Sequence, residues 1–317
     1  MAIQQPTADS RGESIRIGAE HPQYAAVLNK QFNKRFTARP DYVRFAASTD
    51  QVVTAVQEAV NERQRLVVTS GGHCLEGFVS DPDVRVIVDV SPMKQIYYDS
   101  ELRAVAVEAG VTVGETFREG VHVPPPPELA RMSWLDFALN PFPDLFTMPP
   151  GGVCMKGKDA LLKKRLTDEQ VGVAYDYLTD TDHDVIGGMF ALATYGGRVN
   201  TVAPDATASA HRSAIFDLAC TSGWLDPKEE AQNLAWVRAF YRDLFAATGG
   251  APVPGDAYDG ALINHPDVDL LDRTLNQSGV PWHTLYYQTG YPRLQRVKAR
   301  WDPLNVFRHP LSIRAEG

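Results

Sequence analysis

The sequence predicts a mixed protein, of the α+β or α/β class, built from about two domains. The chain has 317 residues, and a typical domain takes about 150 residues. A helical apolar pattern at 50–63 is followed by extended segments rich in β-branched residues. A helix followed by several strands is the element order of mixed folds. The apolar content of 44% is that of a globular chain with a sizeable core.

The N-terminal part of the chain contains short, well-separated patterns. Pro40 biases Arg39 away from helix. The apolar residues of 50–63 recur at helical spacing after Thr49, a suitable N-cap. We expect helices at 21–33 and 50–63, an extended segment at 39–46, and strands at 65–70, 84–90 and 103–110. A further helix should start within 111–120.

The character of the chain changes after residue 120. Four prolines at 124–127 predict a stiff, extended connector, with a wall of a substrate site as the alternative. Beyond them we expect strands at 144–157, 184–199 and 213–224, and the second of these is buried and opened by paired glycines. We also expect a capped helix at 166–179, an amphipathic helix at 227–247 and a closing helix at 281–303. The amphipathic helix carries one apolar stripe: Leu234, Val237, Phe240, Tyr241 and Leu244.

Composition excludes several kinds of protein. The formal net charge of −8 argues against non-specific binding to nucleic acid or to anionic membranes. The cysteines, Cys74, Cys154 and Cys220, are odd in number and far apart, which argues against a disulfide framework and against a zinc site. The first 20 residues have no apolar signal core, and the chain has no run of about 20 apolar residues. We therefore expect a soluble, cytoplasmic protein.

One short motif carries a chemical signal. Residues 69–77, Thr-Ser-Gly-Gly-His-Cys-Leu-Glu-Gly, place paired glycines directly after a strand. Glycines let backbone N–H groups approach a phosphate closely, and the hydroxyl of Ser70 adds a donor. His73 then lies at the rim of the loop. A tight turn with a surface histidine explains the motif equally well when it is taken alone.

The surrounding residues give the motif a family context. SGGH at 70–73, IVDVSPMKQI at 87–96 and AVAVEAGVTVGE at 104–115 resemble the first half of the FAD-binding domain of berberine-bridge-like oxidases. The closing segment 286–313 is similar to the segment of these oxidases that returns to the cofactor domain. Without the resemblance, this segment is an amphipathic helix with Leu294, Val297 and Trp301 in the core.

The resemblance implies an α+β fold with a divided cofactor domain. Residues 1–120 would form part of a PCMH-type FAD-binding domain, and 281–317 would return to it. Residues 121–280 would form a substrate domain, an antiparallel sheet backed by helices. The expected activity is that of a flavoprotein oxidoreductase of secondary metabolism. It takes hydride from an alcohol carbon of a small molecule, a secondary metabolite or a sugar, and oxygen reoxidises the flavin.

The same resemblance assigns candidate site residues. It implies that His73 is bonded covalently to FAD, and a neutral imidazole is a competent nucleophile for such a bond. It implies that Tyr195 acts as a base or an orienting group, although a core tyrosine explains this position equally well. Where the family has a second tyrosine beside Asn264, this chain has His265, which becomes the substitute candidate. The remaining candidates for holding the cofactor are Thr69, Ser70, Gly71, Gly72, Gly77, Asn264 and Asn305.

The chain departs from the family in one large respect. The family has a long second cofactor segment, with a glycine-rich stretch and a cysteine, where residues 116–118 here run almost directly into the prolines. A cofactor domain without that segment would expose apolar faces and unpaired strand edges. Either a second copy of the chain covers the gap in a homodimer, or flavin is held weakly or lost. The alternative to an oxidase is therefore an internally deleted, non-catalytic remnant that binds a ligand without flavin.

Overall fold

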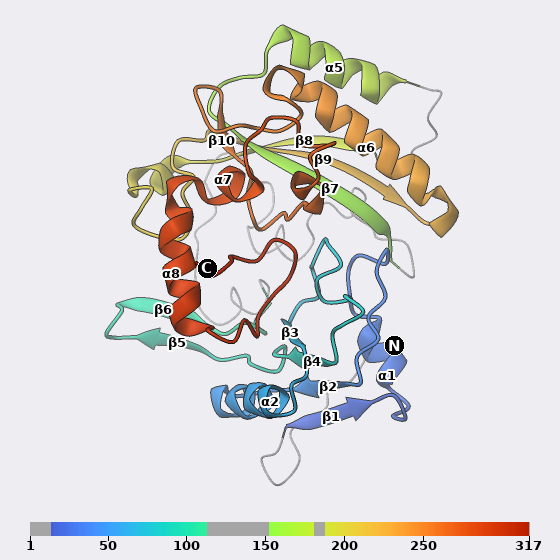
Figure 1. Ribbon diagram of the computed structural model, residues 1–317, viewed down its shortest axis with the longest axis vertical. Coiled ribbons are helices and arrows are strands. Elements are labelled where there is room, and N and C mark those ends of the chain that lie inside the picture. The colour runs from blue at the N-terminus through green and yellow to red at the C-terminus, as the bar shows by residue number, and fades with distance from the viewer. Residues whose placement is uncertain (1–13, 113–151, 181–187, 317) are drawn as a thin grey trace, which may run out of the picture. The chain divides into compact units, whose positions relative to one another are not determined.

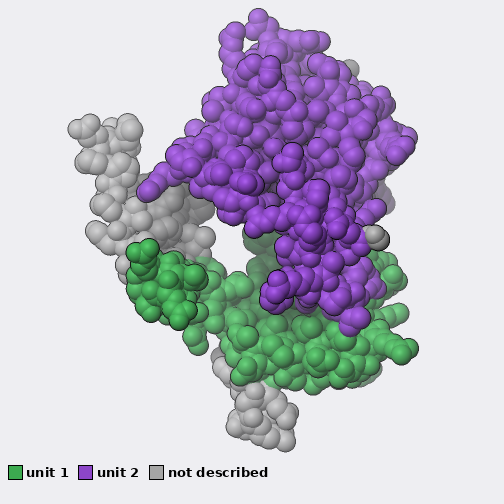
Figure 2. All heavy atoms as spheres, turned by 60° about the vertical axis from the view of Figure 1, so that its left-hand side comes forward, with its two compact units in different colours: residues 1–32, 37–73, 79–152 green, residues 33–36, 74–78, 153–317 purple. Residues whose placement is uncertain are grey.

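The computed structural model describes residues 14–112, 152–180 and 188–316 (Figure 1). The chain forms two compact units (Figure 2). Unit 1 comprises residues 1–32, 37–73 and 79–152, and unit 2 comprises residues 33–36, 74–78 and 153–317. The predicted division at residues 120 and 280, with the last segment returning to the cofactor domain, stays a prediction.

Unit 1 is built on a four-stranded sheet of order β1-β2-β4-β3. The strands are β1 Ile15–Gly18, β2 Tyr42–Phe45, β3 Leu66–Thr69 and β4 Val86–Asp89. β1 pairs antiparallel with β2, whereas β4 runs parallel to both β2 and β3. All four residues of β4 are buried, as expected for a strand covered on both faces. The predicted strands at 39–46, 65–70 and 84–90 are therefore confirmed.

Two helices and a small hairpin complete the described part of unit 1. Helix α2, Thr49–Asn61, confirms the helix predicted at 50–63, but its N-cap is Ser48, whose hydroxyl accepts from the backbone N–H of Gln51. Helix α1 covers only Tyr24–Leu28 of the range predicted at 21–33. Strands β5, Ile96–Asp99, and β6, Ala104–Val107, form a two-stranded antiparallel sheet within the described residues. The helix predicted at 111–120 and the proline connector lie outside the described residues.

The β5–β6 hairpin exposes many of its apolar side chains. The exposed members are Tyr97, Tyr98, Leu102, Val105 and Val107. This exposure agrees with the expectation that an incomplete cofactor domain leaves apolar surface uncovered, because a two-stranded ribbon cannot bury its own faces.

Unit 2 is built on a four-stranded antiparallel sheet of order β10-β7-β9-β8. The strands are β7 Cys154–Leu162, β8 Met189–Thr194, β9 Phe216–Trp224 and β10 Tyr258–Gly260. Helices α5, Asp168–Thr179, and α6, Glu230–Leu244, lie along one face of this sheet (Figure 1). The antiparallel sheet backed by helices is therefore present as predicted.

The core of unit 2 lies between the sheet and these helices. Ala160, Leu162 and Leu218 of the strands are buried against Val237 and Phe240 of α6. All five residues of the predicted apolar stripe of α6 are buried. Because side chains alternate along a strand, the residues between the core positions of β7 and β9 point to the opposite face of the sheet.

Three predictions about unit 2 were wrong in detail. The strand predicted as buried at 184–199 is β8, an edge strand whose side chains are mostly exposed or half-buried. The closing helix is broken at Gln288, whose φ is +48°, so it forms α7, Trp282–Tyr287, and α8, Tyr291–Trp301. On α8, Val297 is 45% and Trp301 76% exposed, so these side chains are not core residues.

A buried ionic cluster fixes the segment that follows β10. Lys156 and Lys158 of β7 contact Glu76, Asp267 and Asp269, and Arg238 of α6 contacts Asp269. The carboxylates and both lysines are almost fully buried. Charges are retained in an interior only when they are paired, so the cluster ties residues 267–269 to the sheet.

Candidate functional site

The SGGH loop of unit 1 is shaped by one glycine. Gly72 has a φ of +73°, and a Cβ there would lie 2.9 Å from the carbonyl oxygen of Lys30. The carbonyl of Gly72 accepts from the backbone N–H of Phe32 at 2.8 Å. Gly72 is therefore required by the packing of the loop itself. Gly71, by contrast, would bring a Cβ only within 3.5 Å of the ring of His73.

His73 is exposed at the end of this loop, and its ring stacks on Phe32 with centroids 5.0 Å apart. The hydroxyl of Ser70 donates to the carbonyl of Ala109 at 2.6 Å, which ties the loop to the segment after β6. An accessible imidazole on a braced glycine turn meets the requirements of a covalent attachment site, because the ring nitrogen must reach the cofactor. The residues at this loop fit FAD in that respect.

The other predicted cofactor residues belong to β3 or to unit 2. Thr69 is the last residue of β3 in unit 1. Gly77 belongs to unit 2, where a Cβ would lie 3.0 Å from the ring of Phe36. Asn264 and Asn305 are exposed in unit 2, and Asn305 has a φ of +51°. Their roles toward the cofactor stay predictions.

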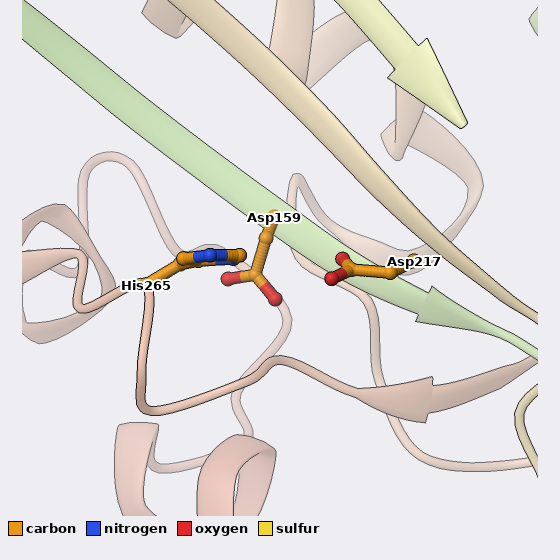
Figure 3. A group of neighbouring side chains, drawn as sticks. All are labelled: Asp159, Asp217 and His265. Carbon is orange, nitrogen blue, oxygen red and sulfur yellow. The ribbon is translucent and has the colours of Figure 1, made fainter. Parts of the chain in front are cut away.

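A cluster of three titratable side chains lies on the sheet of unit 2. Asp159 comes from β7, Asp217 from β9 and His265 from the segment after β10, and the three side chains face one another (Figure 3). Their ligand atoms all lie within 4.8 Å of one another. We call these three residues the Asp-Asp-His cluster. Both aspartates alternate with core residues, so they occupy the sheet face opposite α5 and α6.

Burial dominates the electrostatics of this cluster. Asp159 is 2% exposed, and its Oδ2 accepts from the backbone N–H of Leu262 at 2.7 Å. Burial raises the pKa of Asp159 well above its ordinary value, and the charge of Asp217 adds to the rise, while the Leu262 hydrogen bond opposes it. Burial also raises the pKa of Asp217, and the charge of His265 opposes part of this rise.

Tyr195 directly follows β8 and continues its alternation, which places it on the same sheet face as the Asp-Asp-His cluster. Its backbone N–H donates to the carbonyl of Ile215 at 2.9 Å. Burial raises the pKa of the phenol, the charge of Arg212 opposes the rise, and the charges of Asp259 and Asp217 add to it. At neutral pH the hydroxyl is therefore protonated and is a hydrogen-bond donor.

His211 is a buried residue of unit 2. It is 2% exposed, and its Nδ1 lies 2.6 Å from the carbonyl oxygen of Asp259. Burial lowers the pKa of His211. A Cβ at Gly260 would lie 3.1 Å from the His211 ring, so the bare glycine leaves the space that the imidazole fills.

Sequence reasoning identified His265 but missed Asp159 and Asp217. A signal for both was present, since each is an acidic residue inside a strand: Asp217 lies among apolar or small residues, and Asp159 lies directly before an apolar run. Acidic side chains are almost never buried without a partner or a function. Their partners could not be predicted, because they come from distant segments of the chain.

Two family models match the chain. Residues 40–121 match "FAD binding domain", and residues 261–314 match "Berberine and berberine like". The first match ends where the proline connector begins. The aclacinomycin-N/aclacinomycin-A oxidase of Streptomyces galilaeus is 28% identical over 504 residues, which cover 97% of this chain and 91% of that relative. That length exceeds the 317 residues of this chain, so the match includes long gaps.

A shorter match joins the chain to a sugar-oxidising relative. The hexose oxidase of Chondrus crispus is 32% identical over 170 residues, which cover 50% of this chain and 31% of that relative. The chain therefore spans less than a third of this second relative's length.

Solved structures extend the similarity to the whole described fold. CrmK, a flavoenzyme involved in the shunt product recycling mechanism in caerulomycin biosynthesis, is 30% identical with a TM-score of 0.83 and is matched over 96% of this chain and 100% of its own. The glycopeptide hexose oxidase complexed with teicoplanin is 28% identical with a TM-score of 0.83, over 95% and 99% of the two chains. The chain therefore belongs to the berberine-bridge-enzyme-like family of FAD-linked oxidases, and it is shorter than its relatives.

Proposed function

We propose that the protein is an FAD-dependent oxidase that converts an alcohol carbon of a secondary metabolite, or of a sugar attached to one, into a carbonyl. One observation carries the proposal: His73 is exposed on a glycine turn in a segment that matches an FAD-binding domain. The names of the relatives support the substrate class, since they include oxidases of aclacinomycins, of a hexose and of a glycopeptide.

In this proposal His73 holds the flavin covalently through a ring nitrogen. FAD supplies the hydride acceptor, which oxygen reoxidises with formation of hydrogen peroxide. The substrate carbon gives up its hydride, and the hydroxyl on that carbon gives up its proton, so that a carbonyl remains. Tyr195 orients the substrate hydroxyl by donating a hydrogen bond, because its raised pKa keeps the phenol protonated. The half-buried imidazole of His265 accepts the hydroxyl proton.

The intact mass of the purified chain tests the attachment. After expression with riboflavin and denaturation in acid, we expect a yellow pellet and a mass excess of one FAD. The variant His73→Ala should lose the mass excess, whereas His21→Ala, which removes an exposed histidine elsewhere, should keep it. A colourless pellet and a bare mass, together with a colourless native protein after FAD is supplied, would refute the oxidase proposal.

One observation favours a second candidate, a ligand-binding protein without flavin. The match to the FAD-binding domain ends at residue 121, and the chain is shorter than the 504 residues over which it matches the aclacinomycin oxidase. In that case the substrate sheet keeps its ligand while the cofactor is lost. The same mass measurement, combined with binding of an anthracycline or a hexose to colourless protein, distinguishes the two functions.

A homodimer is a further part of this proposal. The exposed apolar residues of the β5–β6 hairpin are the surface that a second copy would cover. Light scattering on the eluting peak in size-exclusion chromatography gives the mass in solution. A monomer at micromolar concentration would contradict this part of the proposal and leave the flavin proposal untouched.

A further inference from the structure

We propose that Asp159, Asp217 and His265 bind a divalent transition-metal ion. The Asp-Asp-His cluster offers two carboxylate oxygens and one imidazole nitrogen, all within 4.8 Å of one another. Metal–ligand bonds of about 2.0–2.2 Å place the ligand atoms of one ion about 3–4 Å apart. Small side-chain rotations therefore close the cluster around an ion.

Unpartnered oxygen atoms point into the cluster. Asp159 is 98% buried, and its Oδ1 has no hydrogen-bond partner among the described residues. Oδ1 of Asp217 is also buried and without a partner there. A buried carboxylate oxygen without a partner is costly, and folds retain such groups when a ligand satisfies them. A cation between these two oxygens removes both penalties at once.

The cations nearest to Asp159 along β7 already form ion pairs on the other face of the sheet. Lys158 precedes Asp159, but its Nζ lies 2.6 Å from Asp267 Oδ2 and 2.9 Å from Asp269 Oδ2. Lys156 likewise pairs with Glu76 and Asp267. Neither lysine is available to Asp159, because both side chains point to the other face of the sheet and Lys156 is the counter-ion of Glu76.

The scaffold holds the three ligands in place. In the β7–β9 register Asp159 lies opposite Ala219, and Asp217 lies opposite Leu161, so the two carboxylates are diagonal neighbours on one face. His265 is two residues before Asp267, which the buried ionic cluster ties to β7. Ligands on strands and on an anchored segment are preorganised, which strengthens metal binding.

The ligand set indicates the class of metal. Imidazole nitrogen suits zinc, iron, nickel and copper, and carboxylate oxygen also suits manganese. Three protein ligands leave positions for water or for a substrate oxygen. The thiols are not involved, because the cluster contains no cysteine. We expect Zn²⁺ to bind more tightly than Mn²⁺, in the usual order of stability.

This inference goes beyond the proposed function, and the binding that it predicts does not require flavin. It has one consequence for the proposed function. A metal ion takes the lone pair of His265, which then cannot accept a proton. With an ion bound, the proton of the substrate hydroxyl would have to pass to a group other than His265.

Isothermal titration of the EDTA-treated full chain with Zn²⁺, and separately with Mn²⁺, tests the proposal in the absence of added flavin. We expect one ion per chain for each metal. Asp159→Asn keeps the shape of the side chain and should weaken metal binding at least tenfold. Asp217→Asn changes the half-buried aspartate in the same way and should weaken binding by a similar factor. The matched controls Asp256→Asn and His21→Gln remove an exposed carboxylate and an exposed imidazole and should leave binding unchanged.

Circular dichroism must first show that each variant is folded. No binding of either metal to the folded wild-type chain would overturn the proposal and would indicate that the two carboxyls share a proton instead. Equal binding by wild type and by both aspartate variants would also overturn it, because the ion would then sit elsewhere. Metal binding without covalent flavin would refute only the oxidase proposal. Covalent flavin without metal binding would refute only the metal site.

Discussion

Replacing Lys156 by methionine removes one cation from the buried ionic cluster. Lys156 is 1% exposed, and its Nζ contacts Glu76 Oε1 and lies 2.7 Å from Asp267 Oδ1. Asp267 keeps a partner in the variant, because Lys158 lies 2.6 Å from its other oxygen. Among the described residues, Glu76 keeps a hydrogen bond from the backbone N–H of Val268, at 3.2 Å. The variant therefore leaves the buried charge of Glu76 without a direct ion pair in this part of the structure.

The expected loss of stability depends on whether Glu76 stays charged or takes up a proton. Breaking a buried pair by removing one partner costs about 3–5 kcal/mol. A carboxyl can avoid the charge by taking up a proton, and holding a glutamic acid protonated at pH 7 costs about 4 kcal/mol at 1.36 kcal/mol per pH unit. The two limits agree, so we expect Lys156→Met to lower the free energy of unfolding by about 3–4 kcal/mol at pH 7.

The pH dependence provides a second, independent check. If the folded variant holds a proton that its unfolded chain releases, acidification favours the folded state. The stability difference from wild type should then shrink by about 1.4 kcal/mol per unit between pH 7 and pH 5. The double variant Lys156→Met/Glu76→Gln removes the unpaired charge and should recover most of the loss at pH 7, with little pH dependence over this range.

Urea titration followed by tryptophan fluorescence measures these quantities, because Trp224, Trp236 and Trp282 are buried in unit 2. Lys164→Met is the matched control, since Lys164 is exposed just after β7. We expect it to change the free energy of unfolding by less than about 0.5 kcal/mol. A loss below about 1 kcal/mol for Lys156→Met, or a loss that does not change with pH, would refute the argument that this pair is buried and obligatory.

Three further changes test other parts of the fold. Thr167→Ala removes the capping box of α5 and should cost about 1 kcal/mol in urea unfolding, whereas Thr167→Ser should cost much less. Gly72→Ala places a Cβ 2.9 Å from a backbone carbonyl oxygen at a φ of +73°, so it should lower the free energy of unfolding by about 1–3 kcal/mol and abolish flavin attachment. Gly71→Ala should keep both the stability and the attachment. For Asp302, burial opposes but hydrogen bonds from Lys298 and two backbone N–H groups outweigh it, so the pKa is lowered. Its contribution is therefore present above about pH 4 and is lost as the pH falls through the lowered pKa, and Asp302→Asn should lower the melting temperature at pH 7 and by a smaller amount at pH 3. A variant that melts equally below wild type at both values would contradict the lowered pKa.

Local patterns predicted the regular elements of both units well. The periodicity of 50–63 and 227–247 was sufficient for α2 and α6, because each helix buries a single stripe of residues. It failed for β8 and α8, where apolar side chains such as Leu192 and Trp301 are exposed. An apolar pattern indicates which face an element can bury, but it does not show whether another element is present to cover that face.

The candidate site was predictable only where its signal is local. The SGGH loop is one continuous stretch, so its strand, turn and exposed histidine could be read together. The Asp-Asp-His cluster joins β7, β9 and the segment after β10, and its geometry depends on a strand register that no local pattern specifies. Resemblance to the family identified His265 as unusual, but it could not identify the two carboxylates that face it.

The charged residues of β7 show why the structure changes the functional interpretation. The sequence places Lys156, Lys158 and Asp159 in one strand, and alternation puts the lysines on one face and the aspartate on the other. The lysines find their counter-ions 80 and 109 residues away in the sequence, at Glu76 and Asp267. Oδ1 of Asp159 finds no hydrogen-bond partner among the described residues. The same strand thus carries two charges that the fold pairs and one carboxyl oxygen that the described residues leave without a partner. That difference makes the sheet face opposite α5 and α6 the place to look for chemistry.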